Sequence, residues 1–371
     1  MSLVLYRKYR PQIFSEIIGQ EHVVQTLTNA LAMGLTSHAY LFGGPRGCGK
    51  TTIARVLAKA LNCQNRKSNE AEPCNECDSC LEINSGRALD LIEIDAATHT
   101  GVDDIRELRE GIQYVPSKSK YKIYIIDECH QLSKGAANAL LKTLEEPPGH
   151  AIFILATTEI HKMIPTIISR CQRFDFRRLT LPEIIKRLEI VAKKEKVKIE
   201  QPALELIAVN SGGSLRDAES LLDQVMSFSG AKGEKDGIKA QDLKDILGLV
   251  EIKTVAYFCD LFFQKKAGEA IKLLNETIDR GLDVQEFAKA LVNYLRQALV
   301  LKIIGSETGN PIITGLTKEE FQKLKNQTDA LSEVGLQKAL NLIIEAENKT
   351  KYSPIPQLPL ELAIVEYSEI V

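Results

Sequence analysis

The stretch Gly44-Pro45-Arg46-Gly47-Cys48-Gly49-Lys50-Thr51 decides how the first part of this chain folds. It fits the pattern G-x-x-x-x-G-K-[ST], follows an apolar segment at 38–42 and precedes an amphipathic segment at 51–62. A strand, a glycine-rich loop and a helix in this order are typical of a phosphate-binding loop, whose backbone N–H groups surround the phosphates. We therefore expect these eight residues and Thr52 to bind a nucleoside triphosphate.

Polar side chains in and beyond this loop predict the chemistry of the bound triphosphate. Lys50 is expected to reach the β- and γ-phosphates, and the Thr51 hydroxyl is expected to ligate Mg²⁺. Asp127 and Glu128 follow the apolar run 123–126, where carboxylates are costly unless their charge is used. We expect Asp127 to hold Mg²⁺ and Glu128 to orient or deprotonate the attacking water. An acidic strand end that faces solvent is the alternative.

The segments around these motifs alternate between strands and helices. Residues 122–126 and 151–156 are apolar at consecutive positions, as in strands that are buried on both faces of a parallel sheet. We predict an α/β fold with a parallel sheet in P-loop order and no strand beyond residue 176. The expected strands are 38–42, 90–95, 122–126 and 151–156, and the expected helices between them are 51–62, 102–112 and 135–145.

The remainder of the chain reads as helical. We predict an ATPase-type domain at 1–178, a small helical domain at 179–243 and an all-α domain at 244–371. The S-x-x-D pattern from Ser214 to Asp217 is typical of a capping box that begins a helix. The glycine- and lysine-containing segment 229–237 is a candidate linker, or alternatively a loop between two helices.

Four cysteines, Cys63, Cys74, Cys77 and Cys80, follow the spacing C-x10-C-x2-C-x2-C. Four thiolates complete a tetrahedral Zn²⁺ site and leave no position for water, so the predicted metal is structural. Its polar spacers predict a surface insert over 63–80. Disulfides are the alternative, although a chain without a secretory signal favours metal or free thiols. The other four cysteines are isolated and are expected to be small buried apolar residues.

Composition excludes several classes of protein. The chain has 371 residues, 44% of them hydrophobic, and a formal net charge of −2. Any contact with nucleic acid must therefore come from local patches or helix ends rather than from a strong overall positive field. No apolar run reaches about 18 residues, which predicts a chain without a membrane partner. The N-terminus has no long apolar core, so we expect a cytoplasmic protein.

The motifs, taken in order, resemble one family, the bacterial DNA polymerase III gamma/tau subunits. The resemblance is close over 3–223 and rests on helical texture and length over the last third. Besides the phosphate-binding loop and the four cysteines, it is carried by YRKYRP (6–11), IGQEH (18–22), DECH (127–130), NALLKTLEEPP (138–148), SRC (169–171) and GSLRDA (213–218). It implies an AAA+ clamp-loader ATPase with a P-loop domain, a helical lid and a helical collar that forms the oligomer.

The resemblance also implies roles for single residues. Arg170 is implied to act in trans on the γ-phosphate that the neighbouring subunit holds, because no acid in its own chain obviously pairs with it. Thr158 is the implied sensor at a strand end, and Arg216 is the implied sensor on the lid. The regions Arg10-Pro11 and Ile17-Ile18 are implied to line the adenine side.

The implied partners are delta and delta-prime subunits, further gamma/tau copies, the beta sliding clamp and primed DNA. ATP would drive clamp opening and loading during replication. DNA would meet helix starts near 98–102, with Arg106 and Arg109 on one face. Two alternatives stay open: a D-E-x-H motor that translocates on nucleic acid, and a non-catalytic scaffold of the delta-prime kind. The SRC motif and the cysteine insert disfavour the motor, and the intact set from Lys50 to Glu128 disfavours the scaffold.

Overall fold

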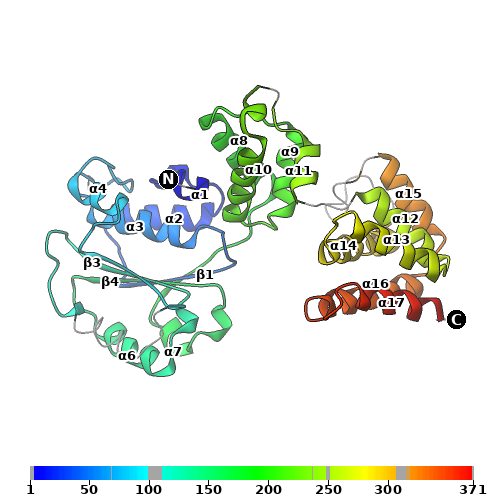
Figure 1. Cartoon of the computed structure of the whole chain (residues 1–371). Coiled ribbons are helices and arrows are strands. Elements are labelled where there is room, and N and C mark those ends of the chain that lie inside the picture. Colours follow the sequence, from blue (N-terminus) through cyan, green and yellow to red (C-terminus); the bar gives the residue numbers. More distant parts are fainter. Residues whose placement is uncertain are drawn as a thin grey trace. The chain divides into compact units, whose positions relative to one another are not determined.

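The computed structural model describes residues 4–67, 69–98, 111–235, 237–247, 251–305, 316 and 318–369. They fall into two compact units, Met1–Gly237 and Ile238–Val371 (Figure 1). The domain boundaries that we placed after residues 178 and 243 stay predictions. In the first unit the described elements are α1 (Leu5–Lys8), η1 (Phe14–Glu16), α2 (Glu21–Met33), β1 (Ala39–Gly43), α3 (Lys50–Asn62), α4 (Asp78–Asn84), β2 (Leu91–Asp95), β3 (Lys122–Asp127), η2 (Cys129–Gln131), α6 (Lys134–Glu145), β4 (Ala151–Thr157), η3 (Ile160–Lys162), α7 (Pro165–Ile168), β5 (Gln172–Asp175), α8 (Leu181–Lys194), α9 (Gln201–Asn210) and α10 (Leu215–Lys235).

The centre of the first unit is a five-stranded sheet with the order β2-β3-β4-β1-β5, in which every pair of neighbours is parallel. Every residue of β1 and β4 is buried. Helices α2 and α3 lie over one face of the sheet and α6 and α7 over the other (Figure 1). Strands covered on both faces carry consecutive apolar residues, which is why the pattern predicted them. The α/β P-loop prediction is confirmed.

The fifth strand, β5, was not predicted. It pairs with β1, with Phe42 opposite Phe174, and forms one edge of the sheet. Only Phe174 among its four residues is buried, so β5 has no apolar run. The ring of Phe174 packs edge-on against the ring of Phe42 at a centroid distance of 5.7 Å. A strand with a single buried apolar residue shows neither an alternating nor a continuous apolar pattern, so the sequence does not reveal it.

Helices α8 to α10 follow the sheet, and the start of α10 was predicted. Helix α8 begins with a capping box between Thr180 and Glu183. The Arg177 guanidinium, at 2.6 Å, lowers the pKa of Glu183 to about 2. Helix α10 begins after Ser214, whose Oγ accepts the Asp217 amide at 3.3 Å.

Helix α10 continues to Lys235, so the linker prediction is wrong for 229–235. The alanine, glutamate and lysine residues of this stretch favour a helix and offset the helix-weakening effect of its two glycines. The stretch also contains no proline. The predicted helix 102–112 and the predicted DNA contacts Arg106 and Arg109 lie outside the described residues, apart from 111–112.

The second unit is helical, as predicted. Its core includes Phe258, Phe287 and Leu291, none of which is exposed. A buried polar network also joins its helices: Tyr294 donates to Gln327 Oε1 at 2.6 Å, and Gln327 donates to the Ala256 carbonyl at 2.8 Å. The described helices are α11 (Ala240–Leu247), α12 (Ile252–Phe263), α13 (Ala267–Asp279), α14 (Val284–Ile304), α15 (Lys318–Asp329), α16 (Glu333–Thr350) and α17 (Leu358–Glu369). Within the described parts of both units, no helix is long and apolar enough to cross a membrane.

Candidate nucleotide site and cysteine cluster

The phosphate-binding loop connects β1 to α3, where the sequence predicted it. Its glycines Gly44, Gly47 and Gly49 have φ of 150°, 75° and 100°, a region that other residues rarely adopt. A Cβ on Gly47 would collide with the Ser214 hydroxyl, and one on Gly44 would collide with the Phe176 carbonyl. The Leu215 amide donates to the Gly47 carbonyl at 3.1 Å. The loop is therefore packed directly against the start of α10.

The loop lysine and threonine contact the loop backbone and the end of β3. Lys50 is 6% exposed, and its Nζ donates to the carbonyls of Gly44 at 2.7 Å and Pro45 at 2.8 Å. Thr51 Oγ1 donates to Asp127 Oδ2 at 2.7 Å. A hydroxyl and a carboxylate oxygen in contact are ligands of the kind that Mg²⁺ takes in nucleotide sites. The two residues are 76 positions apart in the sequence, and they meet because the start of α3 lies beside the end of β3.

Glu128 is held in a defined position just beyond β3. Its φ of 47° is left-handed, a conformation that costs about 1–3 kcal/mol for a non-glycine residue and is common at functional sites. Its amide donates to Asp127 Oδ1 at 3.0 Å. Its Oε2 accepts from the Thr158 hydroxyl at 2.8 Å and from the Thr158 amide at 3.2 Å. Thr158, the implied sensor, therefore contacts the carboxylate of the implied base.

A cavity of about 470 Å³ gathers most of the predicted residues. It is lined by Arg46, Gly47, Gly49, Lys50, Thr51, Thr52, Asp127, Glu128 and Arg216, whereas Gly44 is not among the lining residues. Arg10 and Pro11 of the implied adenine side also line it, whereas Ile17 and Ile18 line a neighbouring cavity of about 520 Å³. Pro45, Cys48, Thr158 and Arg170 are not among the residues that line the first cavity.

The lid side of the cavity contains residues that sequence reasoning missed. The Arg216 guanidinium lies 4.9 Å from the centroid of the Tyr6 ring, and its hydrogen bond lowers the pKa of Tyr6. Arg187 and Glu219, both at the cavity wall, are 5% and 4% exposed and form an ion pair of 2.7 Å. Burial raises the pKa of Glu219. Arg187 also donates to the Tyr9 carbonyl. The N-terminal segment is thus tied to α8 and α10.

A signal for Arg187 was present in the sequence. Ile184, Leu188 and Val191 form the buried stripe of α8, and Arg187 occupies the same face. A charged residue on an apolar stripe requires a buried partner. The partner itself, 32 residues away, could not be identified from the pattern.

The expectation that Arg170 has no anion in its own chain is wrong. Its Nη2 lies 2.6 Å from Glu145 Oε1, at the end of α6, and its Nη1 donates to the Thr166 carbonyl at 2.9 Å. The acid precedes Arg170 by 25 residues, so the local sequence did not reveal it. The two side chains are 33% and 49% exposed. Such exposed pairs contribute about 0–1 kcal/mol, so the guanidinium can exchange this partner at little cost.

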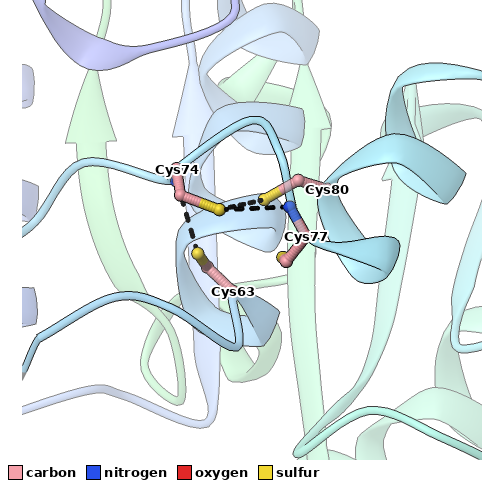
Figure 2. Close-up of side chains that lie close together, drawn as sticks. All are labelled: Cys63, Cys74, Cys77 and Cys80. Atoms are coloured by element: carbon pink, nitrogen blue, oxygen red, sulfur yellow. Dashed lines mark hydrogen bonds between the residues drawn. The ribbon is translucent and has the colours of Figure 1, made fainter.

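The four predicted zinc cysteines converge (Figure 2). Their sulfur atoms all lie within 4.8 Å of one another, and Cys74 Sγ lies 3.9 Å from Cys80 Sγ. Zn–S bonds of about 2.3 Å in a tetrahedron place the sulfurs about 3.8 Å apart, so the arrangement fits zinc. As described, all four side chains are free thiols rather than disulfides.

Hydrogen bonds from backbone amides lower the pKa of one of these thiols, Cys74. Burial alone would raise the pKa of Cys74, but the amides of Glu76 and Cys77 donate to its sulfur at 3.4 Å and 3.3 Å. The net effect lowers the pKa of Cys74 to about 6. The thiolate is the form that binds metal.

The cysteine insert is also tied to the N-terminal segment, which was not predicted. Glu72, between Cys63 and Cys74, accepts from the amides of Phe14 at 2.7 Å and Ser15 at 2.8 Å. Nearby, Lys59 is 2% exposed and donates to Gln12 Oε1 at 2.8 Å. These contacts fix the chain just beyond Arg10 and Pro11, at the cavity wall.

The family models and the curated relatives name one group of proteins, the DNA polymerase III subunits. Family models match in three places: "DNA polymerase III, delta subunit" over 19–180, "DNA polymerase III clamp loader subunit, ATPase lid domain" over 183–231, and "DNA polymerase III subunits gamma and tau domain III" over 238–369. The DNA polymerase III subunit tau of Bacillus subtilis is 43% identical, and the match covers 98% of this chain and 62% of that protein.

A second relative matches over nearly its whole length. The DNA polymerase III subunit gamma of Buchnera aphidicola from Acyrthosiphon pisum is 36% identical, over 98% of this chain and 97% of that protein. The chain spans only about half to two thirds of the tau subunits that it matches. Among solved structures, the Thermotoga maritima RuvB branch migration motor aligns with a TM-score of 0.48 and 20% identity, over 85% of this chain and 98% of that one.

Proposed function

Because the chain belongs to the DNA polymerase III gamma/tau family, we propose that it is an ATP-hydrolysing subunit of a clamp loader. In this role it opens the beta sliding clamp and loads it onto primed DNA in the bacterial cytoplasm. The observation that carries the proposal is the hydrolytic arrangement around the phosphate-binding loop. Thr51 bonds Asp127, and the adjacent Glu128 is fixed by Thr158. A scaffold that only binds ATP has no need of an oriented base.

Each residue of the site has a chemical task. Lys50 and the loop amides bind the phosphates, and Thr51 and Asp127 would hold Mg²⁺, which neutralises phosphate charge when bound. Glu128 orients the attacking water and accepts its proton. Arg216, at the cavity wall on α10, contacts the triphosphate from the lid and so links nucleotide binding to the position of the lid.

Assembly completes the site. Further copies of this chain, with delta and delta-prime subunits, would place Arg170 of one copy against the γ-phosphate held by the next. The half-exposed pair with Glu145 keeps the guanidinium ordered, and its weakness allows the phosphate to take over as partner.

Reconstitution tests the proposed function directly. The chain is combined with delta, delta-prime, the clamp and nicked circular primed DNA, and we expect ATP hydrolysis that the clamp and DNA stimulate, with clamp retained on the circle. Lys50→Ala removes a buried ammonium from the phosphate loop, so ATP affinity should fall by about 100-fold or more. Clamp retention that needs no ATP, or strand separation by the chain alone, would contradict clamp loading.

The cysteine cluster gives a second test. We propose that it holds one structural zinc, and elemental analysis of freshly reduced protein should find about one zinc per chain. Cys80→Ser removes a fully buried ligand and should abolish zinc and lower the melting temperature, because metal binding contributes folding free energy. Cys171→Ser, outside the cluster, should keep the metal. Zinc-free wild type, or equal zinc loss in both variants, would exclude the assignment.

A further inference from the structure

His130 lies beside the proposed base, in the short helix η2. Its imidazole is 6% exposed. Its Nδ1 lies 2.9 Å from Thr157 Oγ1 and 3.4 Å from Glu128 Oε2, and its Nε2 lies 3.1 Å from Glu159 Oε2. Both ring nitrogens therefore face oxygen atoms, and those atoms belong to residues at the ends of two adjacent strands.

The chemistry of the partners fixes the ring. An ionised carboxylate only accepts hydrogen bonds, so Nε2 donates to Glu159. With the ring proton on Nε2, Nδ1 is an acceptor, so it accepts from the hydroxyl of the fully buried Thr157, whose Oγ1 in turn accepts the Glu159 amide at 3.0 Å. Lys162 donates to the same oxygen of Glu159, Oε2, at 2.8 Å, and this hydrogen bond lowers the pKa of Glu159. The imidazole is thus a rigid bridge from the end of β3 to the end of β4.

Glu128 needs such a support. Its backbone is left-handed at φ 47°, and its side-chain contacts with the described residues Thr158 and His130 all involve Oε2. Among the described residues, Oε1 has no hydrogen-bond partner, so it is the oxygen that can receive a proton from water. A general base works only if that oxygen is placed to within a fraction of an ångström.

We propose that His130 is a positioning residue for Glu128: it fixes Thr157 and Glu159 on either side of Thr158, whose hydroxyl and amide hold the carboxylate so that its second oxygen is aimed into the nucleotide cavity. The inference rests on the proposed ATPase function and adds a residue to its machinery. It does not require the imidazole to touch the nucleotide or the water.

The test measures ATP turnover in the reconstituted complex. His130→Ala should lower kcat by about 10- to 100-fold, because a carboxylate displaced by about 1 Å loses that much, while the KM for ATP stays within about twofold. His130→Asn keeps a polar group at the place of Nδ1 and should recover most of the lost rate. His161→Ala is the matched control: this histidine also approaches Glu159, at 3.8 Å, but is 73% exposed and should keep full activity.

A second measurement separates positioning from a general loss of structure. In the Glu128→Gln background, single-turnover hydrolysis should fall by less than about twofold when His130→Ala is added, because residues that act as a unit are not additive. A full additional loss, a parallel rise in KM, or no recovery in His130→Asn would overturn the positioning role. So would wild-type turnover in His130→Ala. If the wild-type complex itself hydrolyses no ATP, the proposed function fails first and the inference fails with it.

Discussion

Replacing Arg170 by alanine is expected to lower the clamp- and DNA-stimulated turnover of ATP by about 10³-fold or more, while ATP binding stays unchanged. An arginine that reaches the transferred phosphoryl group from a neighbouring subunit stabilises charge that develops only in the transition state. Arg170 is absent from the residues that line its own chain's nucleotide cavity, so its loss should leave the binding site intact. Turnover is measured in the reconstituted complex, and binding is measured by calorimetry on the same preparation.

A control and a mixing experiment sharpen this prediction. Arg173→Ala removes a nearby arginine of β5 that pairs with Asp175 at 2.9 Å, and it should cost little. Complexes assembled from a mixture of Arg170→Ala and Lys50→Ala copies should regain part of the turnover. An intact nucleotide pocket in one copy then meets an intact Arg170 in the next. Mixed complexes that stay as inactive as either parent would show that the arginine acts within its own chain.

Contiguous motifs explain why much of this site could be predicted from the sequence. The phosphate-binding loop and the cysteine spacing are local patterns in which the chemistry fixes both residue type and separation. Strands β3 and β4 are adjacent and parallel, so Asp127, Glu128 and Thr158 lie at the same edge of the sheet. At that edge Thr158 donates to Glu128, and Thr51 at the start of α3 donates to Asp127.

Contacts between distant segments could not be predicted. The pairing of Arg170 with Glu145 depends on how the end of α6 meets α7, and nothing in the local sequence specifies it. The same holds for Glu72. Its carboxylate accepts from the amides of Phe14 and Ser15, which precede it by 58 and 57 residues. Side-chain reach and helix packing decide such contacts, and hydrophobic periodicity carries no information about them. These contacts link the cysteine insert and Arg170 to the rest of the chain.

Glu128→Gln is expected to separate ATP binding from hydrolysis. Glutamine has the shape of glutamate, and its side-chain oxygen can still accept from Thr158, so the site should keep its geometry. It cannot accept the proton of the attacking water, which should lower kcat by about 10²- to 10⁴-fold. ATP affinity should stay within about twofold of wild type, in contrast to Lys50→Ala, which removes a group that binds the phosphates.

The same variant also tests whether hydrolysis drives release of the clamp. With ATP bound but not hydrolysed, the complex should engage clamp and primed DNA and then remain on them, which a dissociation measurement against excess unlabelled DNA detects. Release at the wild-type rate would mean that hydrolysis at Glu128 is not the step that frees the clamp. Loss of ATP binding would instead mean that the charge of Glu128 supports the fold of the loop. We do not expect that second outcome. The amide of residue 128 can still donate to Asp127, and the glutamine oxygen can still accept from Thr158, so the left-handed backbone keeps its hydrogen bonds.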